Sequence, residues 1–493
     1  MQTKFKHFSN MAQRVKVFFL FGLMISSVLS VYAQDSIYYK IGVSGIASSG
    51  EIAPFWLHSN RFGMYSMSPF SSTNFGEIGK EFKNSGSCFD YGFKANGQLR
   101  FDEKGASVYL HEYYAKVRGF GFLDLIVGAR EEYLGCQDSI LSSGGFLFST
   151  NSRPMPKITI GIEEYTAIPF TKGYIQIKGA LVHGWMNDTR YVENTLLHHK
   201  YLYVKLGGSF PLNFHYGLNH VVQWGGIHPE LGKLAHGFDD YKRMFSAQGG
   251  TDENNPNDYN NVQGNHIVSK SYQMDIKFSR FKLSAYWQNL REDLPLNYIL
   301  MEKMNIADGL WGISLKSDKT PFLSGVLYEF LNTTDQAGPY HDKDGLIYGG
   351  SDNYFSNSIY QSGWSYFSRT IGTPLITPPI KTETGYYPYN DRTIVHHIGI
   401  NGSVYGYNYR FLSSLSRSYG VYSVEFEKVM KCTSLLLEIN KTVSQWGNLE
   451  LACAIAADIG EIPAVEMNII KKGGNSFGIS FSIRKKGFLT SFR

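Results

Sequence analysis

Charged residues are scarce in this 493-residue chain: Asp, Glu, Lys and Arg make up only 18% of it, against about 25% in a typical soluble globular domain. Aromatic residues are abundant instead, with 34 Phe, 34 Tyr and 7 Trp, or 15% in total. Disordered chains contain few aromatic residues and carry a high net charge, so this composition excludes extensive disorder.

Long apolar runs and basic surfaces are also lacking. After residue 33 no stretch approaches the ~18 consecutive apolar residues of a membrane-spanning helix, and the mean hydropathy is −0.22. These two observations exclude a polytopic helical membrane protein. Lys4, Lys6, Arg14 and Lys16 supply four of the five formal positive charges, which leaves 5 − 4 = +1 for the rest of the chain. Without a basic stripe, we expect no nucleic-acid partner.

Residues 1–33 have the pattern of a cleaved secretory signal. A basic segment precedes the apolar run 17–25, and Val31, Tyr32 and Ala33 form a small-residue cleavage pattern. We expect removal of this segment, leaving 493 − 33 = 460 residues that are exported from the cytoplasm.

Cysteine is rare, with four residues in the whole chain: Cys88, Cys136, Cys432 and Cys453. There is no Cys-x-x-Cys pair, and the His-His pairs at 198–199 and 396–397 have no third ligand nearby, so we expect neither a metal nor a cofactor. Export permits disulfides. Two possibilities therefore remain open: a disulfide between Cys88 and Cys136, or a free thiol at each of these positions.

From about residue 89, apolar and polar residues alternate with period two, which is typical of strands with one apolar face. Clear examples are the segments 93–101, 157–163, 201–206, 212–219, 274–279, 281–288 and 477–483. About eighteen such segments, each of roughly 8 to 12 residues, match the length of a tilted membrane-spanning strand. We therefore predict an all-β, transmembrane outer-membrane β-barrel of about 18 antiparallel strands over 34–493. One or two soluble β domains are the alternative.

Three long stretches interrupt the alternation. Residues 34–88 include the first of them and are expected to hold a small N-terminal plug or periplasmic helical element, while 223–265 and 334–394 are expected as long external loops. Short turns at one end and long loops at the other are typical of outer-membrane barrels. Loops of this length are usually functional or disordered, and their aromatic content favours order.

The long stretches also contain recognisable motifs. In chain order these are Pro54-Phe55-Trp56-Leu57, Ser59-Asn60-Arg61-Phe62-Gly63, Gln223-Trp224-Gly225-Gly226, Gly264-Asn265-His266, Asp352-Asn353-Tyr354, Tyr360-Gln361-Ser362-Gly363-Trp364-Ser365-Tyr366, Ile371-Gly372-Thr373-Pro374-Leu375 and His396-His397-Ile398-Gly399-Ile400. In their order and spacing, over most of the exported chain, they resemble the Wzi-type capsule assembly family of Gram-negative outer membranes, in the form found in Bacteroidetes.

The resemblance implies an eighteen-stranded outer-membrane barrel with a small periplasmic helical element, which binds capsular or exopolysaccharide at the cell surface. Capsular or exopolysaccharide, outer-membrane lipids and the capsule export machinery are the partners it implies. One departure is at the end of the chain, where Phe492 is penultimate and Arg493 is last, because outer-membrane barrels usually end on an aromatic residue.

Binding of a glycan requires aromatic faces for the C–H side of sugar rings and planar polar groups for the hydroxyls. Two loop regions combine both residue types and form the predicted glycan-binding set: Trp224, Asp240, Tyr241 and Arg243, with Asp352, Asn353, Tyr354, Tyr360, Trp364, Tyr366 and Arg369. The arginines would pair with carboxylates of an acidic polysaccharide. The alternative is that these aromatic residues pack the loops into a plug.

Catalysis is not expected. A glycosidase needs two carboxylates flanking a cleft, whereas the acidic pair Asp239 and Asp240 is adjacent and would point to opposite faces of a strand. We predict a lectin-like protein that binds surface polysaccharide and assists its attachment or assembly. A diffusion porin is the first alternative, and an outer-membrane lipid or glycan hydrolase is the second.

Overall fold

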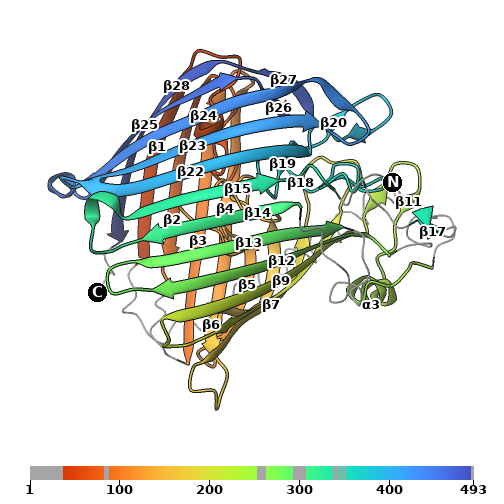
Figure 1. Ribbon diagram of the computed structural model, residues 1–493, viewed down its shortest axis with the longest axis horizontal. Helices are drawn as coiled ribbons and strands as arrows, with labels where there is room; N and C mark the ends of the chain where they lie inside the picture. Colours follow the sequence, from red (N-terminus) through yellow and green to blue (C-terminus); the bar gives the residue numbers. More distant parts are fainter. Residues whose placement is uncertain are drawn as a thin grey trace, which may run out of the picture.

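The computed structural model describes residues 37–82, 88–251, 262–292, 307–336, 342–343, 346–347 and 351–489. Its main sheet has 18 strands, and each strand pairs antiparallel with the next one along the chain. The first strand, β1 (Ile37–Ser48), also pairs with the last, β28 (Ser476–Leu489), so the sheet closes into a barrel (Figure 1). The predicted all-β barrel of about 18 strands is confirmed.

The remaining wall strands follow in chain order. They are β2 (Phe70–Lys80), β3 (Phe89–Asp102), β4 (Gly105–Gly119), β5 (Leu123–Ala129), β6 (Pro156–Ala167), β7 (Ile175–Trp185), β8 (Leu196–Leu206), β9 (Leu212–Trp224), β12 (Asn265–Lys277), β13 (Lys282–Glu292), β14 (Gly309–Lys316), β15 (Gly325–Asn332), β22 (Arg392–Val404), β23 (Tyr407–Gly420), β24 (Glu425–Val443) and β25 (Leu449–Gly460).

The period-two pattern separates a lipid-facing surface from a lumen. On β9, the exposed side chains of Leu212 and Phe214 point outward, while Asn213 between them is buried inside. Because successive side chains of a strand point to opposite faces, one apolar and one polar surface result. An apolar outer surface is what a barrel in a bilayer requires.

A row of aromatic side chains crosses six neighbouring strands on the outer surface. Directly paired positions place these rings side by side: Tyr216, Tyr272, Trp287, Trp311, Phe330 and His396. Neighbouring ring centroids in this row lie 5.0 to 6.2 Å apart. Aromatic girdles of this kind mark the level of the membrane interface in outer-membrane barrels. We call this set the aromatic row.

The two ends of the barrel differ in their connections. At one end the links are short: Tyr405 and Gly406 alone join β22 to β23, and β1 begins and β28 finishes there. At the other end lie the long segments 49–69, 130–155, 225–264 and 333–391. In outer-membrane barrels the short turns are periplasmic and the long loops are extracellular, so the second end is the extracellular one.

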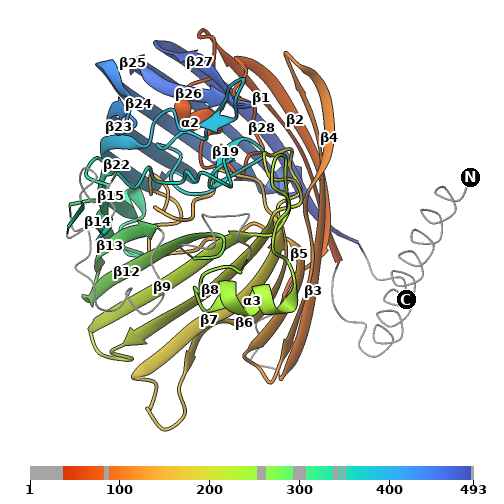
Figure 2. The ribbon, with the colours of Figure 1, turned by 90° about the vertical axis from the view of Figure 1, so that its right-hand side faces the viewer.

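Several long segments fold into the lumen and pack against the inner wall. A single buried apolar cluster joins Trp56 of segment 49–69, Leu141 of segment 130–155 and Tyr354 of segment 333–391 to the wall residues Val221 and Leu327. Figure 2 shows these segments between opposite walls of the barrel. We call this packed set of segments the plug.

The expected N-terminal element over 34–88 is only partly a plug. Its flanks are the wall strands β1 and β2, and its middle, 49–69, carries the short helix α2 (Phe55–His58) inside the barrel. The second helix, α3 (Phe238–Phe245), lies at the extracellular end, and two 3-10 turns, Pro321–Leu323 and Ser444–Trp446, lie in periplasmic turns. Segment 130–155 forms a large part of the plug, and we did not predict this from the sequence.

Short hairpins complete the extracellular end. They are formed by β10 (Ile227–His228) with β11 (Gly232–Lys233), β16 (Asp342–Lys343) with β17 (Leu346–Ile347), β18 (Ser365–Tyr366) with β19 (Arg369–Thr370), β20 (Ile380–Lys381) with β21 (Tyr386–Tyr387), and β26 (Ile462–Glu466) with β27 (Ile469–Gly473).

Cys88 and Cys136 do not form the disulfide that we left open. Cys88 precedes β3 at the periplasmic end, whereas Cys136 lies in the plug, and all four cysteines are free. Within the described residues, no helix is long and apolar enough to cross a membrane. The expected signal segment 1–33 and the chain end with Phe492 lie outside the described residues.

Candidate functional site

The two predicted loop regions meet at the extracellular end. Gln223 Nε2 donates a hydrogen bond to the Gly363 carbonyl at 3.1 Å, and the Tyr360 hydroxyl donates to the Gly225 carbonyl at 3.3 Å. Asn357 Nδ2 also donates to Asn265 Oδ1 at 3.3 Å. Segment 333–391 is therefore fastened to the base of segment 225–264.

Four aromatic residues of the predicted set lie inside the plug. Tyr354, Tyr360, Trp364 and Tyr366 are each no more than 2% exposed. Their polar atoms have partners within the protein: the Tyr354 hydroxyl donates to Asp308, the Trp364 indole to the Leu147 carbonyl at 2.8 Å, and the Tyr366 hydroxyl to Asn187. In this conformation the rings hold the plug together, and their stacking against sugars stays a prediction.

Asp352 and Asn353 are half-buried beside the plug rather than on an open surface. Their backbone N–H groups donate to Gln336, to its carbonyl at 3.2 Å and to its Oε1 at 3.3 Å respectively. Asn353 has a left-handed φ of 44°, a conformation that Asn tolerates better than most residues. The pair forms a turn that leads Tyr354 into the interior.

Arg369 fastens two plug segments to each other. Its guanidinium donates to the Tyr65 carbonyl at 2.9 Å and to the His58 carbonyl at 3.4 Å, and it lies 3.1 Å from His58 Nδ1. Burial lowers the pKa of Arg369 to about 10, a shift that the carboxylate of Glu466 partly opposes. Its pairing with an acidic sugar stays a prediction.

The other four predicted residues lie apart, at the outer surface of the wall. Trp224 ends β9 with its side chain outward, and its ring lies 5.6 Å from that of Tyr241 on α3. Asp240 accepts a hydrogen bond from the Gly237 N–H at 2.8 Å and so caps α3, and Arg243 is half-buried on the same helix. The wall separates this group from the plug, so the structure does not combine the two predicted groups into one site.

Four aromatic residues and one glutamine, none of them in the predicted set, form a cluster on the extracellular face. We call it the outer tyrosine cluster: Tyr191, His228, Gln361, Tyr386 and Tyr387. The ring of Tyr191 lies 5.1 Å from His228 and 6.0 Å from Tyr386, in both cases edge to face. Tyr387 is 49% exposed, and Gln361 Oε1 accepts from the Tyr386 N–H at 3.0 Å.

The three tyrosine rings of this cluster are half-buried or exposed, whereas His228 is buried, and polar groups beside the tyrosines can reach sugar hydroxyls. Burial and the nearby carboxylate of Glu230 raise the pKa of Tyr191, so its phenol stays protonated at neutral pH and can donate a hydrogen bond. The sequence signal was the run Gly385-Tyr386-Tyr387-Pro388-Tyr389. Tyr191 could not be found this way, because it belongs to a different, short loop.

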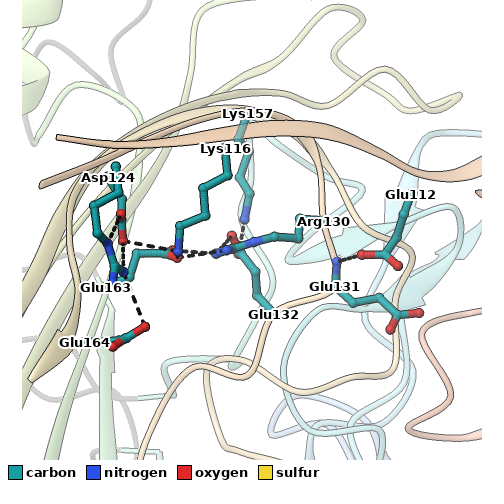
Figure 3. Close-up of polar contacts among 10 residues, drawn as sticks. Glu112, Lys116, Asp124, Arg130, Glu131, Glu132, Lys157, Glu163 and Glu164 are labelled. Carbon is teal, nitrogen blue, oxygen red and sulfur yellow. Dashed lines mark hydrogen bonds and ion pairs between the residues drawn. The ribbon is translucent and has the colours of Figure 1, made fainter. Parts of the chain in front are cut away.

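Between the start of the plug segment 130–155 and the inner wall lies a balanced network of charges (Figure 3). Four basic side chains face four carboxylates: Lys116, Arg118, Arg130 and Lys157 with Asp124, Glu132, Glu163 and Glu164. Burial alone would raise the pKa of Glu132, but Lys157 and Arg130 lower it to about 2. Since every charge of this network has an opposite partner, the network does not form an unpaired anion site.

A polar cavity of about 270 Å³ lies between segment 49–69, segment 130–155 and the wall. Arg61 and Arg410 line it, and both donate to Glu438 Oε2, at 2.6 and 3.1 Å. Among the residues that the structure describes, no group of three or more His, Cys, Asp or Glu side chains is arranged to hold a metal ion. The polar cavity and the outer tyrosine cluster are surfaces to which a ligand could bind.

Comparison with known proteins places the fold. No protein-family model and no curated protein sequence matches the chain. Among solved structures, it is similar to Wzi of Escherichia coli, a carbohydrate-binding outer-membrane β-barrel involved in group 1 capsule assembly. The TM-score is 0.55 at 13% identity, covering 94% of this chain and 86% of Wzi.

Structures of two Pseudomonas aeruginosa barrels, OpdL and OprD, match with TM-scores of 0.46 and 0.45 at 9% identity. Each match covers 93% of this chain, together with 100% of OpdL and 96% of OprD. The likeness to Wzi, at 13% identity, shows the fold alone, which is that of an outer-membrane β-barrel.

Proposed function

We propose that this protein is a lectin-like barrel of the outer membrane that binds capsular or exopolysaccharide and assists its attachment or assembly at the cell surface. One observation carries the proposal. The long loops are packed into a plug with an apolar core, while the outer tyrosine cluster stays partly exposed on their extracellular face. The likeness to Wzi, a carbohydrate-binding barrel, adds support. Membership of the Wzi-type family in its Bacteroidetes form, and contact with capsule export machinery, belong to this proposal.

The proposed mechanism is binding alone. Aromatic rings present flat apolar faces and edges to the C–H groups of sugars. Gln361 and the exposed Glu230 lie beside the rings and can bind hydroxyl groups. One site of this size binds a repeat unit weakly, but a polymer that engages many barrels at once is retained by multivalency.

The loop plug argues against a diffusion porin as the main role. An open pore requires a continuous polar path, whereas Trp56, Leu141 and Tyr354 join plug segments to the wall in one apolar cluster. Planar-bilayer conductance of the purified protein distinguishes the two functions. We expect no stable open level, and a large constant conductance would favour the porin.

The test is polysaccharide retention by cells that carry the variant Tyr191→Ala/Tyr386→Ala/Tyr387→Ala. The matched control is Tyr405→Ala, which removes a 95% exposed tyrosine from a periplasmic turn. We expect the triple variant to release polysaccharide into the medium as a deletion strain does, while the control retains it. Retention by a correctly folded triple variant would reject the outer tyrosine cluster, and retention by the deletion strain would reject the function itself.

A further inference from the structure

The polar cavity of about 270 Å³ lies on the side of the plug away from the outer tyrosine cluster. Arg410, which lines it, is the fourth residue of β23, and this strand begins at a periplasmic turn. Arg484, also in the lining, lies five residues before the periplasmic end of β28. Asp138 lines the cavity from the plug and binds Lys316, the last residue of β14 before a periplasmic turn, at 2.7 Å. The cavity is therefore on the periplasmic side of the plug.

The charges of this cavity cancel. Four basic and four acidic side chains line it or bind residues that line it: Arg61, Arg410, Arg484 and Lys316 with Glu131, Asp138, Glu438 and Glu450. Glu131 also lies 2.8 Å from the imidazole of His111, which is counted as neutral. Because burial of an unpaired charge is costly, the cavity favours a neutral polar ligand over an ion.

The three arginines keep hydrogen-bonding capacity that their ion pairs do not use. The side chains of Arg61, Arg410 and Arg484 are 21, 22 and 28% exposed. A guanidinium group has five N–H donors, and contacts within the described part of the chain use only one or two of them on each arginine. Donors on the exposed part of each group are therefore open to hydroxyl groups of a ligand.

An exposed aromatic ring lies beside these donors. Tyr133 lines the cavity and is 56% exposed, and its ring packs edge to face against Phe62 with the centroids 5.5 Å apart. Phe62 belongs to the sequence motif 59–63 and has a left-handed φ of 52°, which is uncommon for a residue other than glycine. The turn in this motif places Asn60, Arg61 and Phe62 together in the lining. Strained backbone of this kind is concentrated at ligand sites.

We propose that this cavity is a second sugar site, which binds one neutral sugar residue on the periplasmic side of the plug. Tyr133 provides an aromatic surface for the C–H groups of the ring, the arginines donate to its hydroxyls, and Glu131 accepts from them. The volume equals that of roughly nine liquid waters, which is room for a single sugar ring. The inference rests on the proposed function for the source of the sugar, which is the same polysaccharide before it leaves the periplasm.

Protection of an introduced thiol tests the proposal on the purified, detergent-solubilised protein. Ser139 lines the cavity and is exposed, so the thiol of Ser139→Cys reacts with a maleimide while the cavity is empty. The probes are glucose, galactose and mannose, with glucuronate as a charged sugar of the same ring size. Mass spectrometry of peptides separates labelling at position 139 from labelling of the native cysteines. The matched control is Ser209→Cys, at an exposed serine in the periplasmic turn between β8 and β9.

We expect at least one neutral sugar to slow labelling at position 139 and none to slow it at position 209. At about ten times its Kd, a sugar leaves about one cavity in eleven empty, so labelling becomes about eleven-fold slower. Tyr133→Ala in the same background should weaken the protection about two- to ten-fold, and Tyr133→Leu serves if that variant does not fold. Tyr405→Ala should leave the protection unchanged. No protection by any neutral sugar, equal protection without the Tyr133 ring, or stronger protection by glucuronate would each overturn the proposal.

Labelling of whole cells shows from which side the cavity is reached. A membrane-impermeant maleimide should label Ser139→Cys only after the outer membrane has been permeabilised. Labelling on intact cells would overturn the periplasmic assignment.

Failure of this inference and failure of the proposed function give different results. Retention of polysaccharide by the deletion strain rejects the proposed function. Release by the deletion strain, together with an unprotected thiol at position 139, rejects only the periplasmic sugar site.

Discussion

Glu329 on β15 is one of the wall residues that hold the plug segment 130–155, beside Gln288 and His397, and Glu329→Gln is expected to weaken this attachment. The side chain is 1% exposed and faces the lumen. Its carboxylate accepts hydrogen bonds from the Ser142 hydroxyl, the Ser143 N–H and the Ser143 hydroxyl, all at 2.6 Å, and from the Tyr286 hydroxyl at 2.5 Å.

Glutamine has nearly the same shape but replaces one acceptor oxygen by an NH₂ donor. This group can turn towards the Ser142 and Tyr286 hydroxyls, which can accept as well as donate, but the charge is gone and all four hydrogen bonds become neutral ones. At roughly 0.75 kcal/mol each, the loss is about 3 kcal/mol. That energy corresponds to roughly a 100-fold increase in the fraction of molecules with segment 130–155 detached.

Planar-bilayer recording of single barrels measures this fraction directly, as the share of time spent at a conducting level. We expect brief openings to become roughly 100-fold more populated in Glu329→Gln, with a lower temperature for the gel shift of the heat-modified form. Glu103→Gln, in an exposed extracellular turn, is the matched control and should behave as the parent. If Glu329→Gln is as closed and as stable as the parent, Glu329 does not hold the plug and the reasoning is wrong.

Three further predictions concern stability, each measured as the temperature at which the barrel unfolds on gels. Burial raises the pKa of Asp391 to about 7. Between pH 4 and pH 7 the folded protein therefore keeps a proton on this carboxyl group that the unfolded chain has released. The free energy of unfolding falls as the pH rises through this range. Asp391→Asn should remove this loss and be more stable than the parent at pH 8, by up to about 4 kcal/mol, and an unchanged pH profile would contradict this. Lys157 and Arg130 lower the pKa of Glu132 to about 2, so the ionised carboxylate stabilises the folded state at neutral pH, and this stabilisation is lost as the pH falls from 4.5 towards 2. Glu132→Gln should therefore be less stable than the parent at pH 7 but not at pH 2. An equal loss of stability at both pH values would refute an electrostatic cause. Gly363 has a φ of +66°, and an added Cβ would lie 2.3 Å from the Phe355 carbonyl oxygen, so Gly363→Ala should destabilise the plug by about 2 kcal/mol; parental stability would show that the loop adjusts without cost.

The barrel could be predicted from the sequence because the residue types along each strand show which of its faces meets lipid and which meets the lumen. Leu212, Asn213 and Phe214 alternate between lipid and lumen, and that pattern is visible without knowledge of any partner strand. The number of strands and the positions of the two longest loops follow from counting such segments. β2 was not predicted as a wall strand, because its Ser, Asn and Gly residues interrupt the alternation of apolar and polar side chains.

The candidate site was less predictable, because the burial of a loop side chain depends on segments far away in the chain. Trp364 is buried in the apolar cluster, and its indole donates to the carbonyl of Leu147, more than 200 residues earlier. Nothing local distinguishes it from Tyr387, which is exposed on the same segment. Likewise, the alternation along β9 predicts that the side chain of Trp224 points outward. It does not predict that α3, later in the chain, packs over the rim against this side chain.

The seam between β1 and β28 has a consequence for biogenesis. Twelve consecutive residue pairs, from Ile37 with Leu489 to Ser48 with Gly478, join the first strand to the last. Until residues 476–489 have been synthesised and exported, β1 and β25 are both edges with unpaired backbone groups, which are costly in lipid and prone to aggregate in water. The chain therefore has to be kept from premature pairing in the periplasm, and closure of this single seam commits it to the membrane.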